Sequence, residues 1–318
     1  MLTQARLALR LHRFTLLAVA AMVALASVAA LVVAAALRSA ATPACLASWQ
    51  GHFFDGSAST PCQEQANQFH QIDGTWAGPL MGIFGGIAPV GGLLVGVALV
   101  AREIEERTAA LAWSLAPSRT RWLFGRVAPV AAVLLALFAI AAIAATELQR
   151  ARDPSVDPLL SFYGESSRGL ELVAIGFMVF TGAVLVGSIV GRVMPSLILA
   201  AVLGLVLTVT AFVAEATWIP SQAVLVDAES ASSYDGALYI EQLVRLQTGE
   251  LIPTQDIVWE TDANGNPTGR LAGSTIEAHL VPGSRHPFVE AVDSAAMMAV
   301  SAVLLVLTAF VVRRRRPS

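Results

Sequence analysis

The chain has 318 residues, of which 56% are hydrophobic and only 14% are charged, and its formal net charge is −3. Soluble domains usually contain about 25% charged residues, so this composition argues against a soluble globular protein. It favours a membrane protein that is surrounded by lipid and has no nucleic-acid partner.

Six apolar runs without a charged residue are each long enough to cross a bilayer, which requires about 20 helical residues. They are 14–37, 77–101, 127–146, 172–191, 195–214 and 294–312. We therefore expect an all-α polytopic membrane protein with six transmembrane helices, located in the cell membrane.

The distribution of arginine predicts the orientation, because the chain contains no lysine. If the N-terminus is cytoplasmic, the inner segments carry 13 of the 20 arginines and three of the 23 acids; they are 1–13, 102–126, 192–194 and 313–318. The outer segments carry the remaining charges; they are 38–76, 147–171 and 215–293. This asymmetry follows the positive-inside rule, so both termini are predicted to be cytoplasmic.

The N-terminal segment 1–13 mixes three arginines with leucines, a pattern typical of a short amphipathic helix on the inner membrane surface. A simple basic flank before the first span is the alternative. Residues 1–42 could also form a cleaved signal peptide. The apolar run of 24 residues, however, exceeds the usual signal-peptide core of about 7–15 residues.

The only two cysteines, Cys45 and Cys62, lie in the first outer segment. An oxidising exterior favours a disulfide between them, with two free thiols as the alternative. The spacing of Cys and His residues that is typical of zinc sites is missing, so no metal is expected.

The second span is rich in glycine. Gly82/Gly86 and Gly92/Gly96 are pairs of small residues at helical spacing, which allow two helices to approach closely. Packing within one subunit is favoured over a seam between two copies. Pro89 is expected to kink this helix.

The outer side contains one sizeable aqueous segment, 215–293, whose turn signals predict a small mixed domain that is partly β. Four acids stand at the outer ends of the spans: Glu171, Glu215, Glu290 and Asp293. They are either solvated interfacial acids or a candidate outer gate for substrate release. No ionisable residue lies within a span, which disfavours an ion-coupled secondary transporter.

Catalytic and nucleotide-binding motifs are missing from the sequence, including the P-loop, HExxH and GxSxG patterns. We therefore expect no enzyme activity and no cofactor in this chain, and another polypeptide would have to supply energy. Two alternatives remain open. The chain could be a non-transporting anchor or sensor with a ligand-reading outer domain, or a membrane-embedded enzyme that uses residues such as His52, Ser57 or His279.

The segment 102–126 between the second and third spans is compact and charged. Its residues predict a helix over 101–115 that ends before Pro117, with Glu103 and Arg107 forming an i,i+4 ion pair. Such a helix at the inner side could pass force from a cytosolic partner into the membrane. A charged connecting loop is the alternative.

The stretch "GVALVAREIEERTAALAWSLAPSRTRWLFGRV" at 96–127 resembles the region between the second and third helices of ATP-binding-cassette (ABC) transporter permeases of the type-2 export class. It is especially similar to actinobacterial members, whose pattern is roughly "LVARExExGTxxLAWTxSxxRxRWL". This chain departs from the pattern at Arg107, where the family prefers Gly, and at Ser114, where it prefers Thr. The two-cysteine loop, "GRVMP" at 191–195 and "VPGSRHPFVEAV" at 281–292 are similar to the same family.

The resemblance implies a coupling helix that docks on a separate cytosolic ABC ATPase, which binds ATP and Mg. The residues it assigns to coupling are Arg102, Glu103, Glu106, Arg107, Trp113, Arg119, Arg121 and Trp122. It also implies that two permeases, identical or homologous, form one export pathway for a lipophilic or amphipathic small molecule, lipid or peptide. The use of Arg and Ala throughout fits a bacterial source with GC-rich DNA.

Overall fold

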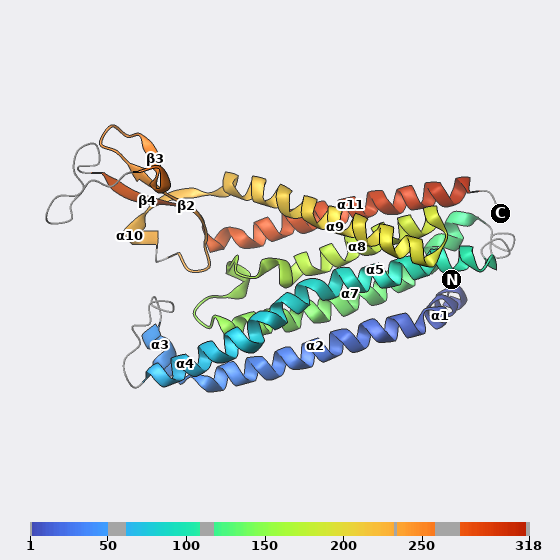
Figure 1. Ribbon diagram of the computed structural model, residues 1–318, viewed down its shortest axis with the longest axis horizontal. Helices are drawn as coiled ribbons and strands as arrows, with labels where there is room; N and C mark the ends of the chain where they lie inside the picture. Colours follow the sequence, from blue (N-terminus) through green and yellow to red (C-terminus); the bar gives the residue numbers. More distant parts are fainter. Residues whose placement is uncertain (1, 50–61, 109–117, 232–233, 258–273, 316–318) are drawn as a thin grey trace.

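The computed structural model of this chain describes residues 2–49, 62–108, 118–231, 234–257 and 274–315. Within these residues, six helices are long and apolar enough to cross a membrane. They run along the long axis of the molecule, and the N- and C-termini lie at the same end (Figure 1). The predicted six-helix architecture is therefore confirmed.

The first two spans are longer than the apolar runs that predicted them. Helix α1 (Leu2–Leu11) precedes α2 (Arg13–Ala40), and a short helix, α3 (Pro43–Trp49), follows. Helix α4 (Gln63–Ile72) continues through a π-helical turn, η2 (Asp73–Ala77), into α5 (Gly78–Glu105). Much of the predicted outer loop 38–76 is thus helical, because polar residues extend the second span beyond its apolar part.

The remaining spans also extend beyond their apolar centres. They are α7 (Arg119–Arg152), α8 (Gly169–Val190), α9 (Val193–Trp218) and α11 (His286–Arg314). Two short 3-10 turns, η3 (Pro158–Leu160) and η4 (Glu165–Ser167), connect α7 to α8. A further 3-10 turn, η5 (Ile219–Gln222), follows α9, and another, η8 (Gly283–Arg285), precedes α11.

Helix α8 is the central helix of the bundle and packs against α5, α7, α9 and α11. Gly92 and Gly96 make its contact with α5 possible. A Cβ atom on Gly96 would lie 2.6 Å from the carbonyl oxygen of Phe180, and one on Gly92 would collide with the carbonyl oxygen of Gly176. At these two positions only glycine permits the close backbone approach of α5 to α8.

The other predicted glycine pair behaves differently. A Cβ atom on Gly82 or Gly86 would meet no atom within 4 Å among the described residues. This pair therefore makes no close backbone contact of the Gly92/Gly96 kind among the described residues, and its packing role stays a prediction. Pro89 lies inside α5, and the kink at this residue stays a prediction.

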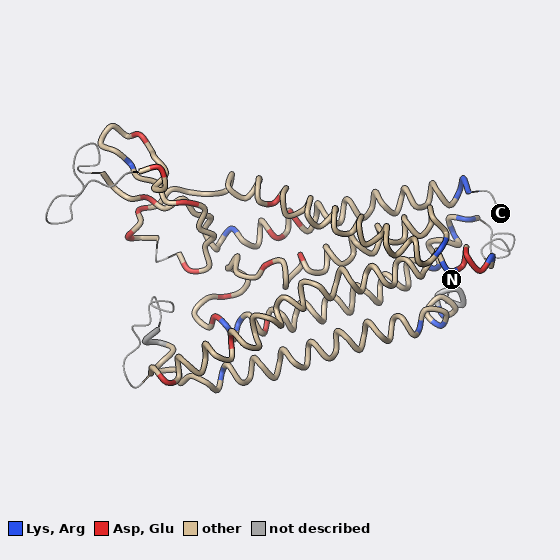
Figure 2. Tube along the Cα trace, viewed as in Figure 1, with Lys and Arg blue, Asp and Glu red and all other residues tan. Residues whose placement is uncertain are grey.

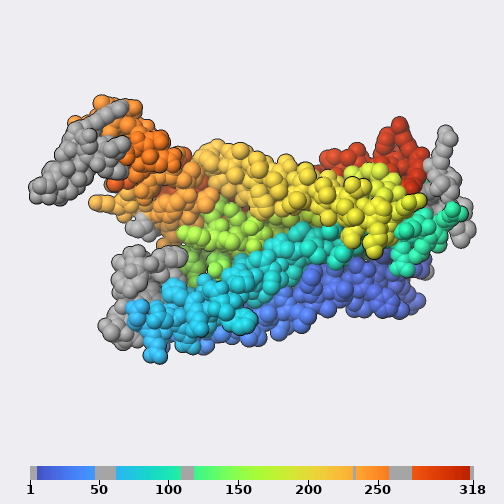
Figure 3. Space-filling model, viewed as in Figure 1, coloured from blue at the N-terminus to red at the C-terminus, as the bar shows by residue number. Residues whose placement is uncertain are grey.

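The segment between α9 and α11 contains a four-stranded antiparallel sheet of order β1-β4-β2-β3. Its strands are β1 (Val224–Asp227), β2 (Leu238–Arg245), β3 (Leu251–Pro253) and β4 (Thr275–Val281). A short helix, α10 (Ala228–Ala231), and a 3-10 turn, η6 (Thr254–Asp256), join them. The sheet projects from the end of the bundle opposite the termini (Figures 1 and 3), as expected for a small mixed domain within 215–293.

The predicted disulfide is present. Cys45 and Cys62 are bonded, with their Cα atoms 5.5 Å apart. The bond joins α3 to the start of α4. Two ion pairs tie neighbouring spans at the same end of the bundle, Arg152 with Asp73 at 2.6 Å and Arg38 with Glu147 at 3.1 Å.

Candidate functional site

The helix ends near the two termini form one arginine-rich end. This end comprises α1, the C-terminal ends of α5, α8 and α11, and the N-terminal ends of α7 and α9. Figure 2 shows basic residues gathered beside both termini, while acidic residues are frequent at the opposite end. The segment that the sequence assigned to coupling lies here, between α5 and α7.

The described part of the helix predicted over 101–115 is interrupted, and residues 109–115 lie outside the described residues. Helix α5 ends at Glu105, and Arg107 adopts φ 60°, the left-handed conformation that favours glycine. Thr108 closes the turn by donating from its hydroxyl to the carbonyl oxygen of Glu103 at 3.1 Å. The prediction of one unbroken helix is therefore wrong at Arg107, the position at which the family pattern has Gly.

The predicted ion pair between Glu103 and Arg107 is also absent. Glu103 instead pairs with Arg126 of α7, and both side chains are almost fully buried between the two helices. The ring of Trp122, one turn earlier on α7, lies 5.6 Å from the guanidinium of Arg126. On the solvent-exposed face at the end of α5, Arg102 pairs with Glu106 at 2.8 Å. The i,i+4 ion pair at this helix end is therefore Arg102–Glu106 and not Glu103–Arg107, because the side chain of Glu103 faces α7.

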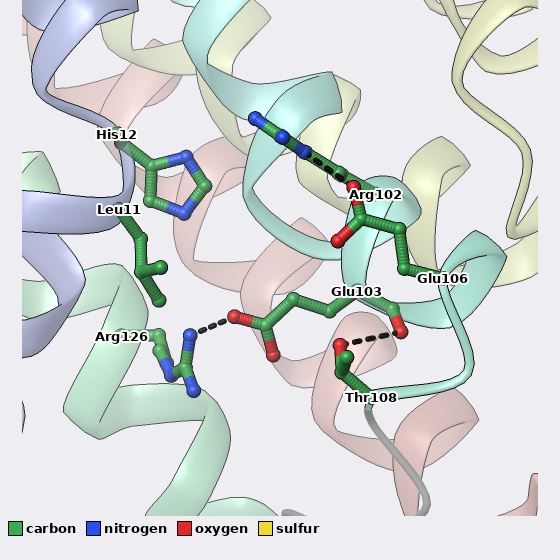
Figure 4. A pocket seen from close by; sticks show the side chains of 7 residues that line it. All are labelled: Leu11, His12, Arg102, Glu103, Glu106, Thr108 and Arg126. Carbon is green, nitrogen blue, oxygen red and sulfur yellow. Dashed lines mark hydrogen bonds and ion pairs between the residues drawn. The ribbon is translucent and has the colours of Figure 1, made fainter.

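A pocket of about 220 Å³ opens beside the Glu103–Arg126 pair. Figure 4 shows His12 at the start of α2 and Leu11 of α1 facing Arg126 across this space, with Arg102 and Glu106 at its rim. Burial, together with the charges of Arg126 and Arg102, lowers the pKa of His12 to about 4. The His12 ring is therefore neutral at physiological pH, and the pocket walls carry two Arg and two Glu side chains.

Three further contacts join the helix ends at the arginine-rich end. Glu105 accepts a hydrogen bond at 2.8 Å from the backbone N–H of Val193, the first residue of α9. Arg119 donates to the carbonyl oxygen of Arg313 at 3.2 Å and so caps the end of α11. Arg315 in turn donates to the carbonyl oxygens of Ser188 and Ile189 at the end of α8.

The predicted coupling residues therefore fall into distinct groups. Four are exposed: Arg102, Glu106, Arg107 and Arg121. Arg119 is half-buried as a helix cap, whereas Glu103 and Trp122 are buried. Trp113 lies outside the described residues. Sequence reasoning missed Arg126, Glu105 and His12, whose roles depend on helices that are distant in sequence.

At the opposite end of the bundle, the structure brings two of the four predicted outer-gate acids close together. Glu171 and Glu215 lie with Glu165, which the sequence did not single out, so that one carboxylate oxygen from each falls within 4.8 Å of the others. Glu290 accepts a hydrogen bond from the backbone N–H of Leu170 at 2.6 Å. Asp293 is half-buried nearby on α11. Their role in a gate stays a prediction.

Of the residues considered for a membrane-embedded enzyme, His279 is the one within the described part of the chain. It lies on β4, where its Nδ1 atom is 3.4 Å from a carboxylate oxygen of Glu241. His52 and Ser57 lie outside the described residues.

Comparison with known proteins gives one family. The family model described as "ABC-2 membrane transporter related" matches residues 12–217, which run from α2 to the last turn of α9. They include the arginine-rich end except α1 and the end of α11. Searches of curated proteins and of solved structures found no match. Because the match covers well over half of the sequence, this chain belongs to the ABC-2 membrane transporter related family.

Proposed function

We propose that this chain is the membrane-spanning subunit of an ABC exporter and that a separate ATPase drives it from the arginine-rich end. The observation that carries the proposal is the family match over residues 12–217 together with six apolar helices. The match includes both helices that flank the segment 102–126. The positive-inside rule places this end in the cytoplasm, where a soluble ATPase, ATP and Mg are available.

Docking would use the exposed side chains on the two flanks of this segment. Arg102 and Glu106 stand on one flank, at the end of α5, and Arg121 stands on the other, in the first turn of α7. Charged residues at an exposed rim favour electrostatic recognition of a partner with matching charge. The buried pair Glu103–Arg126 is not available for such contact.

Force would then pass into the bundle through the contacts between helix ends. Glu103–Arg126 joins α5 to α7, Glu105 joins α5 to α9, and Arg119 joins α7 to α11. A displacement of the α5–α7 connection is thus transmitted to several spans at once. Packed helices move as rigid bodies because their interiors resist compression.

The exposed apolar surface of helix α9 is suited to pairing with a second permease or to contact with lipid. Its apolar side chains are strongly exposed in the single chain, as for Met194 at 73% and Ile198 at 67%. A lipophilic or amphipathic substrate would pass between two such subunits, identical or homologous.

The experiment is co-purification of the full chain with the products of its neighbouring genes, identification of any bound ATPase, and reconstitution into lipid vesicles. Arg121→Ala should weaken ATPase binding because it removes an exposed contact. Arg119→Ala should preserve binding and loosen the coupling between ATP hydrolysis and substrate movement. Arg285→Ala, at the opposite end of the bundle, is the matched control. Wild-type binding and coupling in both test variants would overturn the assignment, and absence of any ATPase would favour the ligand-sensing alternative.

A further inference from the structure

The outer end of the bundle contains a buried carboxylate cluster that the proposed transport function does not use. Glu165 begins the turn η4, Glu171 lies in the first turn of α8, and Glu215 lies in the last turn of α9. One carboxylate oxygen from each lies within 4.8 Å of the others, and Glu171 is only 2% exposed. Three carboxylates that are withdrawn from water at this separation repel one another, so the cluster must either hold protons or hold a cation between its oxygens.

A fully buried histidine lies beside Glu165 of this cluster. His286, the first residue of α11, has its Nδ1 atom 3.0 Å from the carbonyl oxygen of Leu159. Because a carbonyl oxygen only accepts, Nδ1 must carry a proton, and in the neutral ring Nε2 then keeps its lone pair. That Nε2 atom lies 3.7 Å from Glu165 and has no hydrogen-bond partner in the structure. The ring of Phe162 packs edge-on against the imidazole at 5.1 Å and fixes its position.

This arrangement of His286 is the one found around bound metals. A ligating histidine usually donates its other ring N–H to a backbone carbonyl or a carboxylate, which fixes the tautomer and aims the lone pair at the metal. Glu171 also presents a buried oxygen, Oε1, without a hydrogen-bond partner. Two different side chains, one in the cluster and one beside Glu165, therefore offer unused, buried ligand atoms.

The nearby charges leave room for a divalent ion. Arg168 is the one arginine close to the cluster within the described residues, and it is 1% exposed. It donates to backbone carbonyl oxygens of Ser161 and Tyr163, at 3.2 Å for Tyr163. Its single positive charge balances only one of the three carboxylates when all three are ionised, as they would be around a bound cation. Glu290 and Asp293 of α11 add further negative potential nearby.

We propose that Glu165, Glu171, Glu215 and His286 form a binding site for a divalent metal cation. A set of carboxylates and one imidazole suits Mn²⁺ or Zn²⁺ better than Ca²⁺, which takes oxygen ligands. The ion would hold α8, α9 and α11 together at the base of the outer domain. Spacing rules in the sequence do not reveal this site, because its four ligands come from four separate elements.

The test is a titration of the purified full chain in lipid nanodiscs with Mn²⁺, followed by electron paramagnetic resonance. We expect one bound ion per chain. Glu171→Gln and Glu215→Gln preserve side-chain shape and should each weaken Mn²⁺ binding by more than about tenfold. Asp256→Asn, which removes an exposed acid in the outer domain, is the matched control and should bind as the wild type does.

His286→Gln tests the choice of metal. The substitution exchanges an imidazole nitrogen for an amide oxygen. It should weaken Mn²⁺ binding more than Ca²⁺ binding, since imidazole suits Mn²⁺ whereas Ca²⁺ prefers oxygen ligands. No stoichiometric Mn²⁺ binding by the wild type, or equal binding by the Glu→Gln variants, would overturn the proposal. The measurement needs no ATPase, so its failure is distinguishable from failure of the transport function.

Discussion

Glu103 on α5 and Arg126 on α7 form an ion pair whose side chains are only 10% and 14% exposed, at the end of the bundle where both termini lie. The exposed pair Arg102–Glu106 stands beside it, with side chains that are 60% and 52% exposed. Glu103 and Glu106 lie within one turn of each other, so the two pairs allow a direct comparison of what a buried and an exposed ion pair contribute to stability.

Glu103→Ala should destabilise the protein by about 3–5 kcal/mol, because it leaves the Arg126 charge buried without a partner. Glu106→Ala removes the exposed pair and should cost no more than about 0.5 kcal/mol. Unfolding in mixed detergent, monitored by circular dichroism, measures both changes in stability. Replacing both Glu103 and Arg126 by Leu should recover most of the loss, and an equal loss in Glu103→Ala and Glu106→Ala would contradict the buried assignment.

Arg107→Gly should stabilise the chain by about 1 kcal/mol, because φ 60° carries a steric cost for every residue with a Cβ atom. Arg107→Ala removes the charge but keeps the Cβ atom, so it should give no comparable gain. The midpoint of thermal unfolding distinguishes the two. A gain of equal size in both variants would attribute the effect to charge and not to backbone conformation.

Gly96→Ala should destabilise the bundle by about 1–3 kcal/mol, because the added methyl group would lie 2.6 Å from a backbone oxygen and 2.7 Å from the Cβ atom of Ala183. Gly82→Ala is the control on the same helix, where the methyl group meets nothing within 4 Å. It should stabilise by up to about 1 kcal/mol, since alanine is the better helix former. Thermal unfolding in nanodiscs measures the difference, and equal effects would refute the close α5–α8 contact.

Stability should fall as the pH is lowered from about 6.5 to about 4, in part because of His12. Its pKa is about 4 in the folded protein, lowered by burial and by Arg126 and Arg102, and about 6.5 when unfolded. Below pH 6.5 the unfolded chain therefore binds a proton that the folded chain does not, at a cost of up to roughly 3 kcal/mol. His12→Gln should remove this part of the pH dependence, and an unchanged slope in the variant would exclude His12 as its source.

The sequence alone determined the class of the protein and the number of its spans. Apolar runs of about 20 residues must be helical in lipid, since a backbone without water has to satisfy its own hydrogen bonds. Paired cysteines in an oxidising compartment, and glycines at helical spacing, likewise carry local signals. For these reasons the six helices, the Cys45–Cys62 bond and the Gly92/Gly96 contact were predictable.

Only the tertiary structure decided which charged residues meet. Periodicity along one helix suggested Glu103 with Arg107, but the approach of α7 made Arg126 the partner. The carboxylate cluster likewise unites residues up to 50 positions apart, Glu165 with Glu215, and adds His286 from the last helix. A buried charge is stabilised by the opposite charge or ligand that the packing of distant helices brings near it. The spacing of residues along one segment does not determine that packing.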